Sequence, residues 1–246
     1  MKKLILICAV PFFAAFAQFT LPSGLGLAKW SGGEDIITGL LAHYPLDEVS
    51  GDALDTSGNS RTMTQVGTVP ATSPGRGPFT VSDYFTRSDV ALDLTASDWT
   101  ICGWFNLSTI GGSQALISHE ASPILTWGVY AYNSGFSNTM AGAVIYHASG
   151  GGNTTVSAPG SAITTGALHF LCATFNNGTL LLSCSLDNGS VGSATASTPA
   201  TQSNATQIGR ATIVFPLLGT AQHVRIYNRV LTAPQISRLY NSGTPN

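Results

Sequence analysis

The sequence predicts an all-β fold in which two antiparallel sheets pack as a sandwich, followed by one short C-terminal helix. Gly- and Asn-rich turn sequences such as "STIGGS", "NNG" and "DNG" separate the predicted strands, as in antiparallel hairpins. At 246 residues the chain fits a single large all-β domain. Short runs rich in β-branched and aromatic residues, which are typical of strands, lie at 99–107, 115–119, 124–132, 141–147, 167–175, 179–186 and 222–228.

Helical periodicity is confined to "LTAPQISRLYNSG", residues 231–243. Thr232 can cap the N-terminus, Pro234 is tolerated in the first turn, and Gly243 ends the last turn. An apolar face is formed by Ile236, Leu239 and Tyr240.

The first residues have the layout of a secretory signal peptide. Two lysines precede an apolar run, and small residues stand at Ala15 and Ala17, so we predict a signal peptide over 1–17. A retained anchor is the alternative, but the run is too short for a stable membrane span. We expect a secreted or cell-surface protein with an N-terminal arm or linker over 18–39 and a sandwich domain over 40–246.

Composition argues against nucleic acid as a partner. Only 9% of residues are charged, against about 25% in an average globular protein. The formal net charge is −2, and no cluster of Lys and Arg could neutralise a row of phosphates. The surface is instead rich in hydroxyl and amide groups.

Four separated stretches resemble, in the same order, the laminin-G-like branch of the concanavalin A-like lectin and glucanase superfamily. This resemblance implies a jelly-roll sandwich in which the strand in "LLAHYPLDE" lies beside the strand in "HVRIYNRVL". Val224 and Ile226 would then face the core, and the helix would cover the sheet edge. The stretches are 40–67, 93–107, 166–189 and 208–243.

Four arginines gather near the C-terminus, at positions 210, 225, 229 and 238. Because isolated arginines usually serve nearby carboxylates, we expect Arg210, Arg225 and Arg229 to form ion pairs across the join of the terminal strands. An anion-binding patch is the alternative. The expected carboxylate partners are Asp47, Glu48 and Asp55.

The cysteines permit at most one internal disulfide in an exported chain without its signal peptide. Cys102, Cys172 and Cys184 would remain. Cys172 and Cys184 flank the turn "NNGT" at similar distances, so a hairpin would place them opposite or one residue out of register. The alternative is that each is a small buried hydrophobic residue.

The stretch "DTSGN" offers oxygen ligands for Ca²⁺. Asp55 and Asn59, with Ser57 between them, place a carboxylate, an amide and a hydroxyl within five residues. The resemblance implies a structural calcium here, completed by an acid just before "VRIYN", but Gln222 and His223 stand there and are poorer ligands. An Asx turn is the alternative for Asp55 and Asn59.

Motifs for catalysis are missing from the sequence. Sandwich glucanases of the resembled superfamily carry carboxylates at E-x-D-x-x-E spacing, which does not occur here. There is no G-x-S-x-G, "HEASP" breaks the H-E-x-x-H pattern, and "SLDNGSVG" lacks the tryptophan of an Asp-box. We therefore expect a protein that is not an enzyme.

Three tyrosines are candidates for a ligand platform. Tyr130 and Tyr132 would share one face of the 124–132 strand, with Tyr146 on the next strand and Trp127 facing the core. Aromatic rings stack on the apolar faces of sugars, so Tyr130, Tyr132 and Tyr146 suggest carbohydrate binding. A core role for these tyrosines is the alternative.

Two classes of function remain, with a third at low weight. The first is a lectin-like binding module for glycans or cell-surface adhesion. The second is a structural subunit of a surface layer, extracellular filament or virion decoration, whose partner is another protein or a further copy in a homo-oligomer. The third, a glycan hydrolase or lyase, would need catalytic side chains assembled from distant strands.

Overall fold

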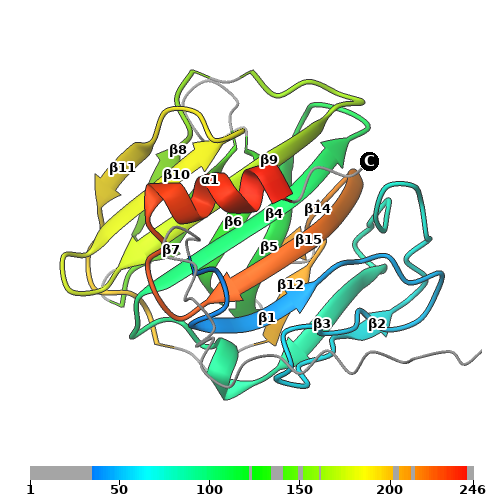
Figure 1. Ribbon diagram of the computed structural model, residues 1–246, viewed down its shortest axis with the longest axis horizontal. Coiled ribbons are helices and arrows are strands. Elements are labelled where there is room, and N and C mark those ends of the chain that lie inside the picture. Colours follow the sequence, from blue (N-terminus) through cyan, green and yellow to red (C-terminus); the bar gives the residue numbers. More distant parts are fainter. Residues whose placement is uncertain are drawn as a thin grey trace, which may run out of the picture. The chain divides into compact units, whose positions relative to one another are not determined.

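The computed structural model describes residues 35–121, 124–133, 141–148, 152–160, 162–201, 205–211 and 214–242. Over these ranges two large antiparallel sheets form the two-sheet sandwich that the sequence predicts (Figure 1). The predicted signal peptide, residues 1–17, and most of the predicted arm lie outside the described residues.

The first sheet has six strands in the order β1-β15-β4-β9-β10-β11. Helix α1, Ala233–Ser242, packs on it through Leu239, Ile236 and Tyr240. Within the described residues no helix is long and apolar enough to cross a bilayer. The strands are β1 Leu40–Tyr44, β4 Trp99–Leu107, β9 Leu168–Asn176, β10 Leu181–Leu186, β11 Gly192–Thr195 and β15 Gly219–Tyr227.

The second sheet has seven strands in the order β2-β3-β12-β5-β6-β7-β8. A 3-10 turn, Val90–Leu92, precedes β4, and a small hairpin joins β13, Arg210–Ala211, to β14, Phe215–Pro216. The strands are β2 Thr64–Val66, β3 Tyr84–Ser88, β5 Ser113–Ala121, β6 Ile124–Asn133, β7 Gly142–Tyr146, β8 Asn153–Ser157 and β12 Ala205–Ile208.

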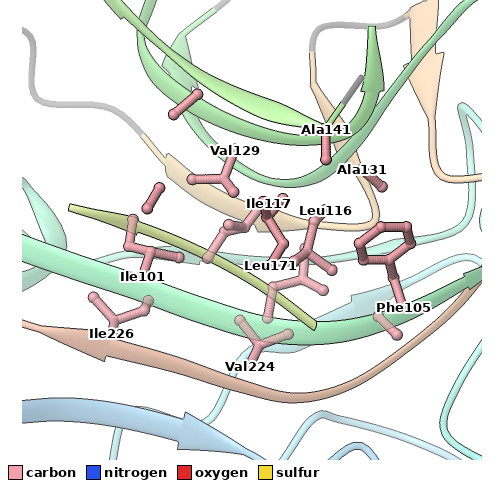
Figure 2. Packing of buried hydrophobic residues seen from close by; sticks show 14 of the residues in the cluster. Ile101, Phe105, Leu116, Ile117, Val129, Ala131, Ala141, Leu171, Val224 and Ile226 are labelled. Carbon is pink, nitrogen blue, oxygen red and sulfur yellow. The ribbon is translucent and has the colours of Figure 1, made fainter. Parts of the chain in front are cut away.

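Alternate side chains of the two sheets meet in one hydrophobic core (Figure 2). Val224 and Ile226 lie in it, as the resemblance implied, and so does Trp127, as its place in the strand predicted. The residues that meet in Figure 2 include Ile101, Phe105 and Leu171 from the six-stranded sheet and Leu116, Ile117 and Val129 from the seven-stranded sheet.

The first and last strands of the sandwich lie side by side, as the resemblance implied. β1 pairs with β15, with Leu40 opposite Tyr227 and His43 opposite Arg225. Arg229, just beyond β15, donates to the carbonyl oxygens of Thr38 at 2.6 Å and Asp35 at 2.7 Å. The chain entering β1 is therefore tied to the chain leaving β15.

The disulfide joins different cysteines from the pair considered in the sequence. Cys102 and Cys172 are bonded across the adjacent strands β4 and β9, where they are direct register partners. Cys184 lies opposite Ala173, so its side chain points to the other face of the sheet and is buried in the main core. A hairpin one residue out of register explains why Cys172 and Cys184 do not meet.

The buried guanidinium of Arg76 joins the loop between β1 and β2, strand β2 and the loop between β2 and β3. It is fully buried and donates to the carbonyl oxygens of Val69 and Gly51 and to Gln65 Oε1. Glu48 Oε2 lies 3.7 Å from Arg76 Nη1, and the guanidinium also lies over the ring of Phe85. The backbone of Arg76 pairs with Ala221 of β15, so the same residue connects these loops to the six-stranded sheet.

Replacing Arg76 should therefore destabilise the fold far more than replacing an exposed arginine. Arg76→Leu leaves Glu48 and several carbonyl groups buried without their donor, which typically costs about 3–5 kcal/mol. Arg238→Leu, at an exposed position on α1, should change the unfolding free energy by no more than about 0.5 kcal/mol. Urea denaturation of both variants measures the difference, and equal midpoints would contradict the role given to Arg76.

Candidate functional site

The outer face of the seven-stranded sheet, the side turned away from the core, carries a row of short and polar side chains. Along β6, Trp127 and Val129 enter the core while Gly128 and Tyr130 point outward. Strand register therefore places one outward residue from each strand in line across the sheet. The row is Thr86, Gln207, Ser118, Gly128 and Val144, from β3, β12, β5, β6 and β7.

Gly128 makes room for the ring of Tyr130 on this face. A Cβ on Gly128 would lie 2.7 Å from Tyr130 Cε2, which is too close for any other residue without a shift of the ring. The ring of Tyr130 thus folds back over the row instead of projecting outward. Its neighbours include Val144, with Tyr146 at the edge of the same cluster.

A carboxylate and two phenols lie within electrostatic reach of one another on β5, β6 and β7. Burial raises the pKa of Tyr130, and Tyr146 and Glu120 raise it further. Burial and the charge of Glu120 also raise the pKa of Tyr146. Both phenols therefore remain protonated hydrogen-bond donors at neutral pH. Glu120 itself is only 4% exposed, while Tyr146 is half-buried.

Arg210 supplies a cation at the other side of the same face. Its guanidinium lies 3.4 Å above the ring centroid of Tyr84, and Nε donates to Gln207 Oε1 at 2.7 Å. A second donation goes to the carbonyl oxygen of Val81. Stacking and two hydrogen bonds hold the guanidinium in a fixed orientation while it remains partly exposed.

The turn at Gly209 positions Arg210 over the sheet. Gly209 has φ +91°, and a Cβ there would lie 2.0 Å from the ring of Phe79, so this turn requires glycine. Ser118 Oγ then donates to the carbonyl oxygen of Arg210 at 2.9 Å. Further along, Phe215 packs at the edge of the cluster that contains Tyr130.

The predicted platform of three tyrosines needs correction. Tyr130 and Tyr132 are 2% and 5% exposed, so neither ring is open for a ligand to stack on. Tyr132 packs with the main core and does not lie beside Tyr130, because the pairing of β5 with β6 is irregular between Gln114 and Ala115. Tyr146 stays as the candidate of the three that reaches solvent.

Glu120 and Arg210 were not predicted as site residues. Alternation along "ALISHEA" does place Glu120 on the same side of β5 as Ser118, which is a signal that could have identified it. Arg210 was expected to pair with a carboxylate, and its actual partners are an amide and a carbonyl group.

Arg225 and Arg229 also lack the expected ion pairs. Arg229 binds the carbonyl oxygens near Thr38 and the side chain of Gln235. Arg225 donates to the carbonyl oxygen of His223. Glu48 pairs instead with Arg76, and both oxygens of Asp55 accept N–H groups nearby.

The geometry around Asp55 and Asn59 does not fit a calcium ion. Asp55 accepts hydrogen bonds from the backbone N–H groups of His43, Ser57 and Arg61, which lower the pKa of its carboxyl group against the effect of burial. Asn59 Nδ2 donates to the carbonyl oxygens of Leu40 and Leu41, and Arg61 Nη1 also donates to the carbonyl oxygen of Leu41. The carboxylate oxygens of Asp55 and these carbonyl oxygens already accept hydrogen bonds, and the guanidinium of Arg61 beside them would repel a cation.

No other metal cluster is evident in the part of the chain that the structure describes. There, no group of three His, Cys, Asp or Glu side chains is arranged to hold an ion. The calcium ion predicted at Asp55 and Asn59 thus finds no support in this geometry, and we derive no role for a cation from it.

Thr164, His169 and Asp187 form a hydroxyl–imidazole–carboxylate series. His169 Nδ1 lies 2.8 Å from Asp187 Oδ2, and Nε2 lies 3.1 Å from Thr164 Oγ1. In the neutral imidazole Nε2 accepts the backbone N–H of Thr164 at 3.1 Å, so its lone pair is engaged and not free to act as the base of a catalytic triad. In the protonated imidazole Nε2 can instead donate to the carbonyl oxygen of Thr164, which lies 3.3 Å away. We assign this series a structural role, joining the loop before β9 to the turn after β10.

Comparison with known proteins gives a family match over most of the chain. Residues 79–237 match the family model Laminin_G_3, described as the concanavalin A-like lectin/glucanases superfamily. No curated protein sequence matches the chain.

Solved structures with a similar fold include proteins from different sources. Domain 4 of AbnA, a GH43 extracellular arabinanase from Geobacillus stearothermophilus in complex with arabinotriose, has a TM-score of 0.63 and 17% identity, covering 82% of this chain and 98% of that one. Trypanosoma rangeli sialidase in complex with sialic acid has a TM-score of 0.59 and 15% identity, covering 83% and 33%. The binding domain of Botulinum Neurotoxin DC in complex with SialylT has a TM-score of 0.54 and 10% identity, covering 85% and 52%.

The bond between His169 and Asp187 should make stability depend on pH. This bond raises the pKa of His169 above its usual 6.5 and outweighs the opposing effect of burial. The stabilisation that this bond adds to the unfolding free energy is therefore complete below pH 6.5, and it is lost as the pH rises through the raised pKa of His169. Asp187→Asn should flatten this decline in urea denaturation between pH 5.5 and 8.5. An unchanged pH profile in the variant would contradict the assignment.

Proposed function

The chain belongs to the concanavalin A-like lectin/glucanases superfamily, and on this premise we propose that it is an exported, non-catalytic module that binds a glycan. The outer face of the seven-stranded sheet would be the binding surface. Export is supported by the leader-like sequence of residues 1–17. The intact mass of the exported protein tests it, because cleavage after Ala17 removes the leader and an unshortened chain would contradict it.

The observation that carries the proposal is that Glu120 and Tyr146 lie on the outer face of the seven-stranded sheet and that Arg210, from the hairpin of β13 and β14, lies over the same face. Tyr146 and Arg210 reach solvent, and phenols and guanidinium groups donate hydrogen bonds to sugar hydroxyl groups. Glu120 is 4% exposed, so its carboxylate accepts a hydrogen bond from a sugar hydroxyl group only after a side-chain shift. Tyr146 adds an aromatic surface that can pack against the apolar side of a sugar ring. Strands position these groups, so little conformational entropy is lost when a ligand binds.

The distribution of acids supports a binding role without catalysis. Within the described strands of the seven-stranded sheet, Glu120 is the only Asp or Glu. Glycoside hydrolysis by the common mechanism needs two carboxyl groups on either side of the scissile bond. A second carboxylate would have to come from outside these strands. We accordingly propose that the chain does not hydrolyse the glycan that it binds.

Proteins of similar fold give this proposal a context. The arabinanase domain was solved with arabinotriose, the sialidase with sialic acid and the neurotoxin domain with SialylT. At 10–17% identity these similarities show the fold alone, and the chain spans only about a third of the sialidase. The three saccharide complexes motivate a broad glycan panel and no particular sugar.

A glycan array of the full chain, with calcium and with EDTA, tests the proposal together with light scattering after size-exclusion chromatography. We expect selective binding to at least one glycan that survives EDTA, since the residues of the outer face do not depend on Asp55 and Asn59. The bound glycan should be recovered uncleaved. A silent array with a large, defined oligomer would instead favour a structural assembly subunit.

Two substitutions locate the glycan on the outer face. Tyr146→Ala removes the partly exposed ring, and Glu120→Gln keeps the shape of the side chain but removes its charge. Each should weaken binding at least tenfold, in line with the loss of a stacking contact or a charge-assisted hydrogen bond. Ser193→Ala, at an exposed position of β11 in the other sheet, is the matched control. Isothermal titration with the best array glycan measures all three, and unchanged affinity in both site variants would rule out this face.

A further inference from the structure

The six-stranded sheet carries a second group of polar side chains on its outer face, beside α1. We define this donor patch as Trp104 on β4, Gln222, His223 and Arg225 on β15, and His43 on β1. Tyr240 of α1 stacks on Trp104, and Leu239 of α1 lies in one cluster with Tyr227 at the end of β15. Most of β1 and β15 lies beside the helix and not beneath it (Figure 1). The patch is therefore at the edge of the area that α1 covers.

An irregularity in β15 brings these side chains to one face. Gln222 pairs with Trp104 and Arg225 with Cys102, so two residues of β15 lie opposite the single residue Gly103 of β4, one more than in regular pairing. His223 has φ +48°, and Val224 turns into the core. Gln222 and Arg225 consequently follow one another on the outer face as alternate residues of a regular strand would. His43 is the register partner of Arg225 on the other side.

Two buried donors of the patch have no acceptor in the described part of the chain. Gln222 and Trp104 are 5% and 4% exposed, and neither Gln222 Nε2 nor Trp104 Nε1 makes a hydrogen bond there. Burying an N–H group without an acceptor destabilises the folded state, because the group loses its hydrogen bonds to water. Two such groups at paired register positions point to a missing acceptor and not to an isolated packing defect.

Arg225 is a half-buried cation with little to neutralise it. Its hydrogen bond to the carbonyl oxygen of His223 is long, at 3.4 Å, and among the described residues no Asp or Glu forms an ion pair with it. Burial lowers the pKa of Arg225. By contrast, Arg76 has Glu48, and Arg87 has Asp89 at 2.8 Å. A desolvated guanidinium is stable when an anion binds it.

The two histidines add polar groups but no positive charge at neutral pH. His43 Nε2 lies 3.3 Å from His223 Nδ1, and His43 Nδ1 lies 2.9 Å from Thr56 Oγ1. Burial, Arg225 and His223 lower the pKa of His43 to about 3, although Asp55 opposes them. Burial and Arg225 lower the pKa of His223, and Asp47 opposes them. The charge that an incoming group meets is therefore that of Arg225.

We propose that the donor patch is a binding site for an oxyanion, with a carboxylate as the best fit. The guanidinium fork of Arg225 matches the two oxygens of a carboxylate, and the amide of Gln222 and the indole of Trp104 are the neutral donors beside it. Reaching the buried nitrogens requires a side-chain shift, and Arg225, held by one long hydrogen bond, is weakly restrained. The site lies on the opposite sheet from the proposed glycan face and does not depend on it.

The carboxylate could belong to an acidic sugar or be a free anion, and the titration separates these sources. The full chain is labelled with ¹⁵N, and the Arg225 Nε–H and Trp104 Nε1–H signals are followed with sodium acetate, sodium glucuronate and sodium sulfate. Sodium chloride at matched ionic strength corrects for screening. Trp104→Phe identifies the Trp104 signal among the indole signals of the four tryptophans.

We expect saturable shifts of both signals with acetate and glucuronate, and weaker shifts with sulfate. Arg225→Gln should weaken binding at least tenfold, because the charged donor is lost, while Arg238→Gln at an exposed arginine of α1 should leave it unchanged. Binding of glucuronate without acetate would identify an acidic sugar as the source of the carboxylate.

Three results would overturn the proposal: no shift beyond that of sodium chloride, equal binding by Arg225→Gln, or equal loss in Arg238→Gln. If Arg225→Gln does not fold, Gln222→Leu replaces it, since it keeps the charge and removes one donor, and unchanged affinity would then overturn the site. Tyr146→Ala should bind acetate like the unmodified protein, so failure of the glycan face and failure of the donor patch are distinguishable.

Discussion

The buried guanidinium of Arg76 is the interaction on which the arrangement of the sandwich depends. Its acceptors lie in β2 and in the loops on either side of β2, one of which also holds Glu48, while its backbone bonds to Ala221 fix these loops to β15. β15 in turn pairs with β1 and β4. The buried charge of Arg76 thus fixes how the loops on either side of β2 pack against the six-stranded sheet, which contains both β1 and β15. Such a group specifies one arrangement because most others would leave it unpaired.

A low content of charged residues shapes the rest of the electrostatics. Several carboxylates serve backbone N–H groups, as Asp55 and Asp83 do, and are then less available to distant arginines. Arg210 and Arg229 therefore bind carbonyl and amide oxygens, whereas Arg225 makes a long hydrogen bond to the carbonyl oxygen of His223. The donor patch follows from this distribution, since Arg225 is half-buried and forms no ion pair with an Asp or Glu among the described residues.

Sequence patterns predicted the strands that carry large apolar side chains, and β4 has the predicted bounds of 99–107. They missed β8, "NTTVS", and β12, "ATQI", because polar residues on the outward face hide the alternation that identifies a strand. The site was harder to predict. Irregular strand pairing decides which side chains share a face, and the sequence does not reveal it. The irregular pairing of β5 with β6, for example, puts Tyr132 in the main core and Tyr130 on the outer face. The partner of Cys172 in the disulfide could likewise not be predicted, because it depends on which strand lies beside β9, and that strand is β4 with Cys102.

The bond between Cys102 and Cys172 closes a ring of chain with a sequence separation of 70 residues. Strands β5, β6, β7 and β8, more than half of the seven-stranded sheet, all lie inside this ring, whereas its base is fastened in the other sheet. A protease that cuts any turn among these four strands opens the ring but releases no fragment. A protein built in this way can lose the continuity of its backbone and still keep both halves of its sandwich together.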